Sequence, residues 1–184
     1  MHDHNRQLST VGALNLAAVR AAQKEWSARP MRERLRLLRE LRHLIAEAAP
    51  ELAATAAEVN QRPLAEKLVS EVLPLADACK WLERSAADVL APRRSGNRGQ
   101  PFWLRGFSFE VHRQPFGVVL VIGPGNYPLF LPAVQALHAL AAGNAVVLKP
   151  APNSSAVAMA FAQLVYDAGF DPALLTILPE SIEA

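Results

Sequence analysis

The sequence predicts an α/β protein in which a helical N-terminal segment precedes the first half of a doubly wound parallel sheet. Apolar residues recur at helical spacing up to about residue 91. Beyond residue 115, three short apolar runs alternate with two helical patterns in the order β-α-β-α-β. We therefore divide the chain into a helical segment (1–91), a linker with a hairpin or edge strand (92–114) and a partial sheet domain (115–184).

The helical segment opens with two helices on either side of Arg29-Pro30. Ser9 or Thr10 is expected to cap the first helix, which runs to Trp26. From Met31 the second helix has apolar residues three and four positions apart, which predicts one buried stripe. Four basic side chains fall on another face: Arg32, Arg36, Arg39 and His43. Because glutamates are interleaved and aromatic residues are missing, we expect this face to be solvated.

Two further helices complete the segment. Pro50 suits the first position of a helix over 51–60, and another helix is expected over 63–90 with a bend at Pro74. Cys79 lies in the last helix without an acid or base partner within one turn. This cysteine is expected to pack in the core rather than to act as a nucleophile.

Proline, glycine and charged residues then replace the apolar pattern between Ala91 and Gly99, which indicates a linker or an exposed loop. Apolar and polar residues alternate over 107–111 and predict a short, half-buried strand. We expect this strand to pair with 101–104 across the turn at Arg105-Gly106.

Three strands are predicted in the last third of the chain. The run 118–122 is rich in β-branched residues and is expected to be buried on both faces. Further strands are expected over 145–148 and 174–178, and the intervening helices end at Ala142 and Ala168. The first two strands are followed by loops with the sequences Gly123-Pro124-Gly125-Asn126-Tyr127-Pro128 and Lys149-Pro150-Ala151-Pro152. Such sheets bind ligands at the carboxyl ends of their strands, where both loops lie.

The segments 115–128 and 141–150 resemble the aldehyde dehydrogenase superfamily in motif order and spacing. The glycine loop differs from the dinucleotide pattern G-x-G-x-x-G, so the resemblance depends on both segments together. It implies a Rossmann-like cofactor-binding sheet. It also implies NAD(P)-dependent oxidation of an aldehyde, or the reverse reduction of an acyl group.

The resemblance also implies roles for individual residues. The backbone of Ile122, Gly123, Pro124 and Gly125 would line the cofactor cleft. Lys149, followed by Ala151 and Pro152, would bind the adenosine ribose, although a surface lysine beside a proline turn is the alternative. Asn126 would donate its side-chain N–H to the developing oxyanion, and a role in loop geometry alone is the alternative.

Two positions depart from the family pattern. Gly125 stands where an aromatic residue is usual, and Pro152 stands where an acidic residue is usual. Without that carboxylate we expect weaker binding of NAD and a shift of preference toward NADP. The cofactor expected from the sequence is therefore NAD or NADP.

The family's chemistry needs a cysteine nucleophile, a carboxylate base and the second half of the cofactor fold, all downstream of a strand such as 174–178. Cys79 precedes the fold and cannot be that nucleophile. We therefore expect a truncated N-terminal part of an aldehyde dehydrogenase that is inactive alone. The alternative is a stand-alone nucleotide-binding or partner-binding module. A helical module that binds nucleic acid is a third hypothesis, and it lacks any supporting motif.

Composition limits the remaining possibilities. A formal net charge of +2 does not favour nucleic acid as a partner, and one cysteine excludes an internal disulfide and indicates a cytoplasmic protein. Glycines and prolines interrupt the uncharged stretch between Arg113 and Lys149, so no membrane span is expected. His2 and His4 have no third ligand, so no metal site is expected. The unpaired last strand predicts a homo-oligomer or association with a missing C-terminal part.

Overall fold

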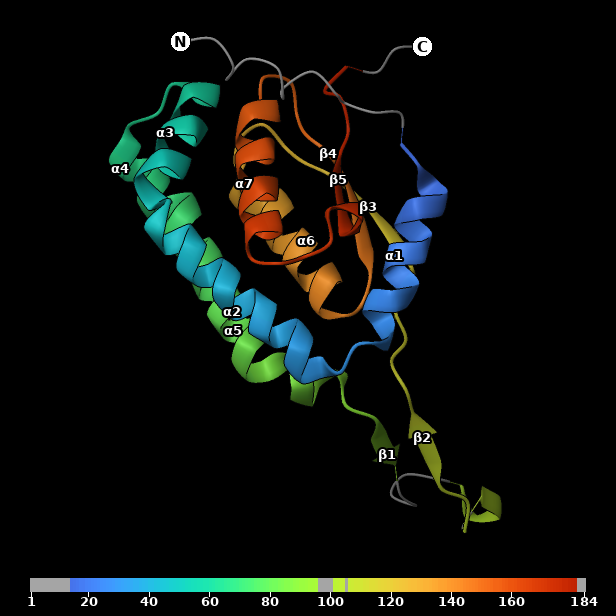
Figure 1. Ribbon diagram of the computed structural model, residues 1–184. Coiled ribbons are helices and arrows are strands. Elements are labelled where there is room, and N and C mark those ends of the chain that lie inside the picture. The colour runs from blue at the N-terminus through green and yellow to red at the C-terminus, as the bar shows by residue number, and fades with distance from the viewer. Residues whose placement is uncertain (1–13, 96–100, 105, 182–184) are drawn as a thin grey trace.

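The computed structural model describes residues 14–95, 101–104 and 106–181 (Figure 1). Its helices are α1 (Leu16–Ala28), α2 (Met31–Glu47), α3 (Ala49–Asn60), α4 (Leu64–Lys67), a π turn (Leu68–Val72), α5 (Leu73–Leu90), α6 (Phe130–Ala141) and α7 (Ser155–Asp167), with 3-10 turns at Phe102–Leu104 and Pro172–Leu174. Its strands are β1 (Arg93–Ser95), β2 (Phe109–Val111), β3 (Val118–Ile122), β4 (Ala145–Lys149) and β5 (Leu175–Ile177).

The strands β3, β4 and β5 form a parallel sheet in that order, with Val118 opposite Ala145 and Val146 opposite Leu175. Helices α6 and α7 cover one side of the sheet, α1 lies on the other side, and α2 and α5 form an outer layer over α6 and α7 (Figure 1). This arrangement confirms the predicted α/β class and the order β-α-β-α-β. One hydrophobic cluster contains buried residues from both the helical segment and the sheet. The division of the chain into domains after residues 91 and 114 stays a prediction.

The outer helices have the two faces that the sequence predicts. Leu38, Leu41 and Ile45 of α2 are fully buried and pack in the same cluster as Leu75 of α5. The four basic residues Arg32, Arg36, Arg39 and His43 are all exposed. The apolar spacing therefore identified the packed side of α2 correctly.

Two helical stretches differ from the sequence prediction, one at its start and one in its interior. Helix α1 begins at Leu16, and the Asn15 side chain accepts a hydrogen bond from the Ala18 N–H at 3.1 Å. Because residue 14 and Asn15 are not helical, the helix does not reach back continuously to Ser9 or Thr10, which lie outside the described residues. A π turn ends two residues before Pro74, whose ring lacks the N–H that a regular helix needs. The bend expected at Pro74 stays a prediction.

The predicted hairpin is wrong in its pairing. Strand β1 pairs antiparallel with β2, and Arg93 lies opposite Val111. The expected partner, 101–104, instead contains a 3-10 turn. All three residues of β2 are exposed, because the two-stranded sheet projects from the body of the molecule (Figure 1). Alternation predicted a strand but could not identify its partner or its surroundings.

Strands β3 and β4 differ in burial. Residues 145–148 of β4 are buried on both faces, as an apolar run predicts. On β3, which is an edge strand of the described sheet, Leu120 is 58% exposed and Ile122 is 67% exposed. The prediction that this strand is buried on both faces is therefore wrong for the described residues, because no described element covers Leu120 and Ile122.

Candidate cofactor-binding site

The carboxyl ends of β3 and β4 bring the two predicted loops together. The Gly123 N–H donates to the Lys149 carbonyl at 2.9 Å, which extends the pairing of the strands into the loops. A Cβ on Gly123 would lie 3.3 Å from the Pro132 Cβ, so the first loop passes close to α6. A Cβ on Gly125 would contact the Ala151 Cβ at 3.7 Å. The predicted residues of both loops therefore share one edge of the sheet.

Lys149 lies half-buried at the end of β4. Its Nζ donates to the carbonyl of Glu180 at 3.0 Å and to the carbonyl of Pro150 at 3.3 Å. Both acceptors are neutral backbone carbonyls, and no described carboxylate forms an ion pair with Lys149. Lys149 is thus a cation held at the edge of the sheet where ligands reach such folds.

The Glu180 side chain caps α7 from beyond β5. Its carboxylate accepts hydrogen bonds from the backbone N–H groups of Asn153, at 2.7 Å, and Ser155. Ser154 holds the cap position but accepts no capping hydrogen bond through its own side chain. Hydrogen bonding from Ser155, followed by that from the neighbouring backbone, lowers the pKa of the Glu180 carboxyl group. Glu180 is not among the site residues that the sequence predicts, although an acidic residue just after the third strand falls at the ligand edge.

Asn126 is exposed on the loop between β3 and α6. Its backbone carbonyl accepts a hydrogen bond from the Asn60 Nδ2 at 3.3 Å. Among the described residues, none forms a hydrogen bond with the Asn126 side chain. Its amide group is therefore available as a donor, as the oxyanion role requires.

A second carboxylate, that of Glu71, caps the start of α6. Glu71 lies on the π turn, and its Oε2 accepts hydrogen bonds from the N–H groups of Leu129 at 2.7 Å and Phe130 at 3.1 Å. Glu71 also forms an ion pair with Lys67, and both side chains are buried. Sequence reasoning missed this pair because two charges four residues apart on a helix usually indicate a solvated surface. Since Glu71 already satisfies these donors, the start of α6 cannot bind a phosphate group in the usual way.

Cys79 lies away from the loops, inside α5, with a fully buried side chain. Burial first and the nearby Glu83 carboxylate second raise the pKa of the Cys79 thiol to about 12, against the opposing effect of Arg42. Glu83 is an acidic neighbour one turn away, which corrects the expectation that the turn holds none. A thiol with this pKa is protonated at neutral pH and is a poor nucleophile.

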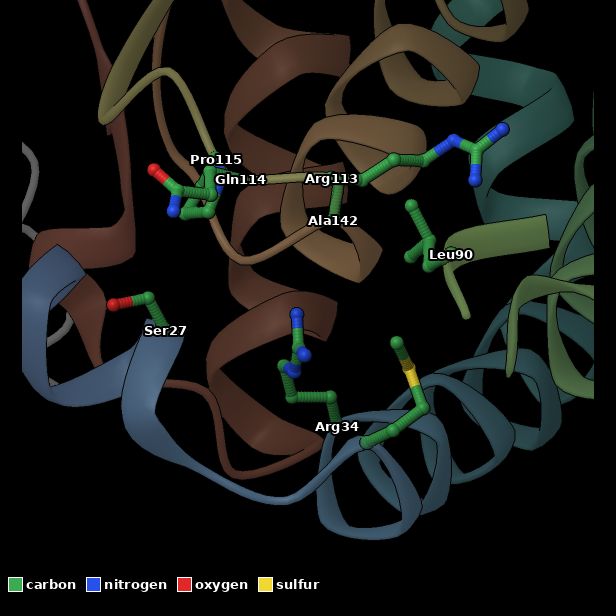
Figure 2. A pocket seen from close by; sticks show the side chains of 8 residues that line it. Ser27, Arg34, Leu90, Arg113, Gln114, Pro115 and Ala142 are labelled. Carbon is green, nitrogen blue, oxygen red and sulfur yellow. The ribbon is translucent and has the colours of Figure 1, made fainter. Parts of the chain in front are cut away.

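A cavity of about 160 Å³ lies at the opposite end of α6 (Figure 2). It is lined by Ser27, Met31, Arg34, Leu90, Arg113, Gln114, Pro115 and Ala142. The Arg34 side chain points toward the end of α6, where its Nη1 donates to the Ala141 carbonyl at 2.8 Å (Figure 2). Arg34 therefore caps a helix, and α6 separates this cavity from the predicted loops by its full length of roughly 18 Å.

Within residues 14–95, 101–104 and 106–181, no group of three potential ligands could hold a metal ion. His2 and His4 lie outside these ranges. None of the helices in the described part of the chain is long and apolar enough to cross a membrane.

The chain is similar to proteins of one family. Residues 10–184 match the model of the aldehyde dehydrogenase family. A Mycobacterium tuberculosis H37Rv protein named for succinate-semialdehyde dehydrogenase activity with NADP(+) is 38% identical over 164 residues, which are 89% of this chain and 30% of the relative. The alpha-ketoglutarate semialdehyde dehydrogenase of Haloferax volcanii is 34% identical over 96% of this chain and 35% of the relative.

A solved structure shows the same similarity. The NADP-dependent glyceraldehyde-3-phosphate dehydrogenase of Bacillus halodurans C-125, in complex with NADP, is 28% identical with a TM-score of 0.79. The match covers 90% of this chain and 34% of that protein. The chain therefore spans about a third of the length of the proteins that it matches.

Proposed function

The chain belongs to the aldehyde dehydrogenase family, and on that premise we propose that residues 115–181 hold the adenosine half of an NAD(P) site in an aldehyde-oxidising or acyl-reducing enzyme. The observation that carries this proposal is the placement of Lys149, Glu180 and the Gly125 loop at one edge of the sheet. The family itself is one of oxidoreductases. When bound, NAD(P) supplies the acceptor for the hydrogen that leaves the aldehyde carbon.

This edge of the sheet offers hydrogen-bonding groups that complement the hydroxyl groups of a ribose. The Lys149 ammonium group donates to hydroxyl oxygens, and the Glu180 carboxylate accepts from hydroxyl groups. Each oxygen of Glu180 accepts one backbone hydrogen bond, and the half-buried carboxylate stays open to solvent. Glu180 thus supplies a carboxylate at this edge, where the second loop has Pro152 in place of the acidic residue that is usual in the family. Gly125 and Ala151 add backbone and small side chains that let a nucleotide approach closely.

This assignment bears on cofactor preference. Pro152 alone predicts a shift toward NADP, whereas a carboxylate at the same edge repels a 2′-phosphate and accepts from a 2′-hydroxyl group. We therefore favour NAD for this chain, with Lys149 able to serve either cofactor. The Mycobacterium and Bacillus relatives are named for NADP, and this cofactor is stated of those proteins alone.

Asn126 is proposed as the donor to the oxyanion that forms on the aldehyde oxygen. The side-chain amide is exposed and has no hydrogen-bond partner within the described part of the chain, which supports this role. The nucleophile cannot be Cys79, whose buried thiol lies inside α5. A thiolate from another part of the polypeptide or from a partner must therefore act beside Asn126, and we expect no aldehyde-dependent reduction of NAD or NADP by this chain alone.

The same part of the sheet supports an association proposal. Leu120 and Ile122 are more than half exposed on β3, and the nearby Phe116 is 97% exposed. Exposed apolar groups on an edge strand favour contact with another polypeptide surface. We propose that this surface is covered in the active assembly, by a second copy or by the part that supplies the thiolate.

Nuclear magnetic resonance can locate the proposed site. Titration with NAD is expected to shift the backbone amide signals of Gly125, Ala151 and Asn153, while signals around the Arg34 cavity stay fixed. Titration with 5′-AMP should shift the same signals, because it carries the adenosine half alone. Shifts confined to the Arg34 cavity would contradict the proposal, and so would the absence of shifts with both nucleotides at millimolar concentration.

A further inference from the structure

The Lys67–Glu71 ion pair lies in the protein interior, where charged groups lose their hydration. Lys67 is 1% exposed and Glu71 is fully buried, and the pair spans the junction of α4 and the π turn. Buried ion pairs often contribute little net stability, because the loss of hydration offsets their attraction. Single π turns inside α-helices are frequent at functional sites. Both observations suggest that the Lys67–Glu71 pair has a role other than stabilising the fold. The contacts of the two side chains indicate what that role is.

Glu71 fixes the point where the Asn126 loop enters α6. Its Oε2 accepts from Leu129 at 2.7 Å and from Phe130 at 3.1 Å, and Phe130 is the first residue of α6. Lys67 contacts the preceding part of the loop, since its Nζ lies 6.0 Å from the centre of the Tyr127 ring. A cation at this distance attracts the face of an aromatic ring.

Asn60, the last residue of α3, adds a third contact. Its Nδ2 donates to the Asn126 carbonyl at 3.3 Å, while its buried Oδ1 has no hydrogen-bond partner among the described residues. An unsatisfied buried acceptor costs free energy. That cost is consistent with an amide held in the orientation that serves Asn126. Side chains from the helical segment therefore hold the loop at three successive points: Asn126, Tyr127 and Leu129–Phe130.

We propose that Lys67, Glu71 and Asn60 are positioning residues that set the backbone of Asn126, so that its side-chain amide meets the oxyanion. This inference rests on the proposed role of Asn126. Glu71 and Asn60 hold the backbone of the loop, and Lys67 faces the Tyr127 ring. None of the three forms a hydrogen bond with the Asn126 side-chain amide, which has no partner among the described residues. Oxyanion stabilisation requires such a donor to be preorganised, and a displacement of about 1 Å can cost a hundredfold in rate. The helical segment is thus part of the site rather than a separate support.

Loop order in the intact chain tests the proposal without any substrate. In the wild type, backbone order parameters of Asn126 and Tyr127 from ¹⁵N relaxation are expected near 0.85, the value for rigid backbone. In Glu71→Gln they should fall below about 0.6, because the two N–H groups lose their charged acceptor and Lys67 loses its counter-ion. The Asn126 side-chain signals should broaden in the same variant.

A double variant, Lys67→Met with Glu71→Gln, separates positioning from stability. Because it leaves no unpaired buried charge, its urea midpoint should return close to the wild-type value. Its loop should nevertheless stay disordered, with order parameters below about 0.6. Arg62→Gln with Glu66→Gln removes the exposed ion pair between Arg62, just before α4, and Glu66 of α4, and should leave the loop rigid.

Either of two results would overturn the proposal. One is a rigid Asn126 loop in the double variant, which would show that the pair acts only through overall stability. The other is an equal loss of order in the Arg62→Gln, Glu66→Gln control. If Asn126 proved not to be the oxyanion donor, the loop measurements would stand, because they involve no aldehyde. Failure of the proposed function and failure of the positioning role are therefore distinguishable.

Discussion

Helices α6 and α7 both start at the ligand edge of the sheet, and a carboxylate from elsewhere in the chain caps each of them. At α6 the cap is Glu71, which is fully buried and paired with Lys67. At α7 the cap is Glu180, which is half-buried and lies beside the ammonium group of Lys149 without pairing with it. The same interaction is therefore inaccessible at one helix and open to solvent at the other.

The difference indicates what each cap can do. A buried carboxylate with its own counter-ion cannot exchange its partners for a ligand, so Glu71 fixes the path of the loop. A carboxylate that is open to solvent can accept a hydrogen bond from a ribose hydroxyl group. Burial, rather than the hydrogen bonds themselves, separates a residue that shapes the site from one that can bind in it.

The largest expected effect is on stability at the buried cap. Glu71→Gln leaves the Lys67 ammonium group buried without a counter-ion, and we expect a loss of about 3–5 kcal/mol in the free energy of unfolding. Urea denaturation measures it. Glu66→Gln, in the exposed ion pair with Arg62, is the matched control and should change stability very little. Equal losses in the free energy of unfolding for Glu71→Gln and Glu66→Gln would contradict the distinction between buried and exposed carboxylates.

A smaller effect is expected at the open cap. Glu180→Gln should lower the free energy of unfolding by less than about 1 kcal/mol, the usual range for an exposed charge at a helix start. Its effect should instead appear in cofactor preference, with roughly tenfold weaker binding of NAD relative to NADP. Asp167→Asn removes a carboxylate from the other end of α7 and should leave the preference unchanged. A stability loss at Glu180 as large as that at Glu71 would contradict the comparison.

Acidification should produce the smallest effect. Because the pKa of Glu180 is lowered in the folded chain, its cap stabilises the fold above the ordinary value of 4.5 and is lost as the pH falls through the lowered value. The amide signals of Asn153 and Ser155 should therefore titrate together with a midpoint below pH 4.5. Glu180→Gln should abolish the titration, and a midpoint above 4.5 in the wild type would contradict the assigned hydrogen bonds.

Local periodicity predicted much of the fold. The apolar stripe of α2, the order β-α-β-α-β and the burial of β4 follow from spacing along the chain. The partner of β2 and the exposure of Leu120 could not be predicted in this way. Both depend on which surfaces meet, and an apolar run carries no information about the element that covers it.

The candidate site shows the same limit. The loops at 123–128 and 149–152 follow strands, and parallel strands place their ends together, so sequence reasoning could bring Gly125 and Ala151 to one edge. Glu180 lies 31 residues beyond Lys149, and Glu71 lies 58 residues before Leu129. Their contacts arise only from packing between distant elements, and a charge pattern alone makes Glu71 look like a surface residue.

The central claim is that Lys149 and Glu180 mark the adenosine end of a cofactor site, and calorimetric titration of NAD and NADP tests it most directly. The Lys149→Ala variant should bind either cofactor roughly ten- to a hundredfold more weakly than the wild type, as expected for the loss of a charged hydrogen bond. Lys80→Ala, at an exposed lysine of α5, should bind as the wild type does. If NAD or NADP binds equally well to the wild type and to Lys149→Ala, Lys149 is an ordinary surface residue and the proposed site is wrong.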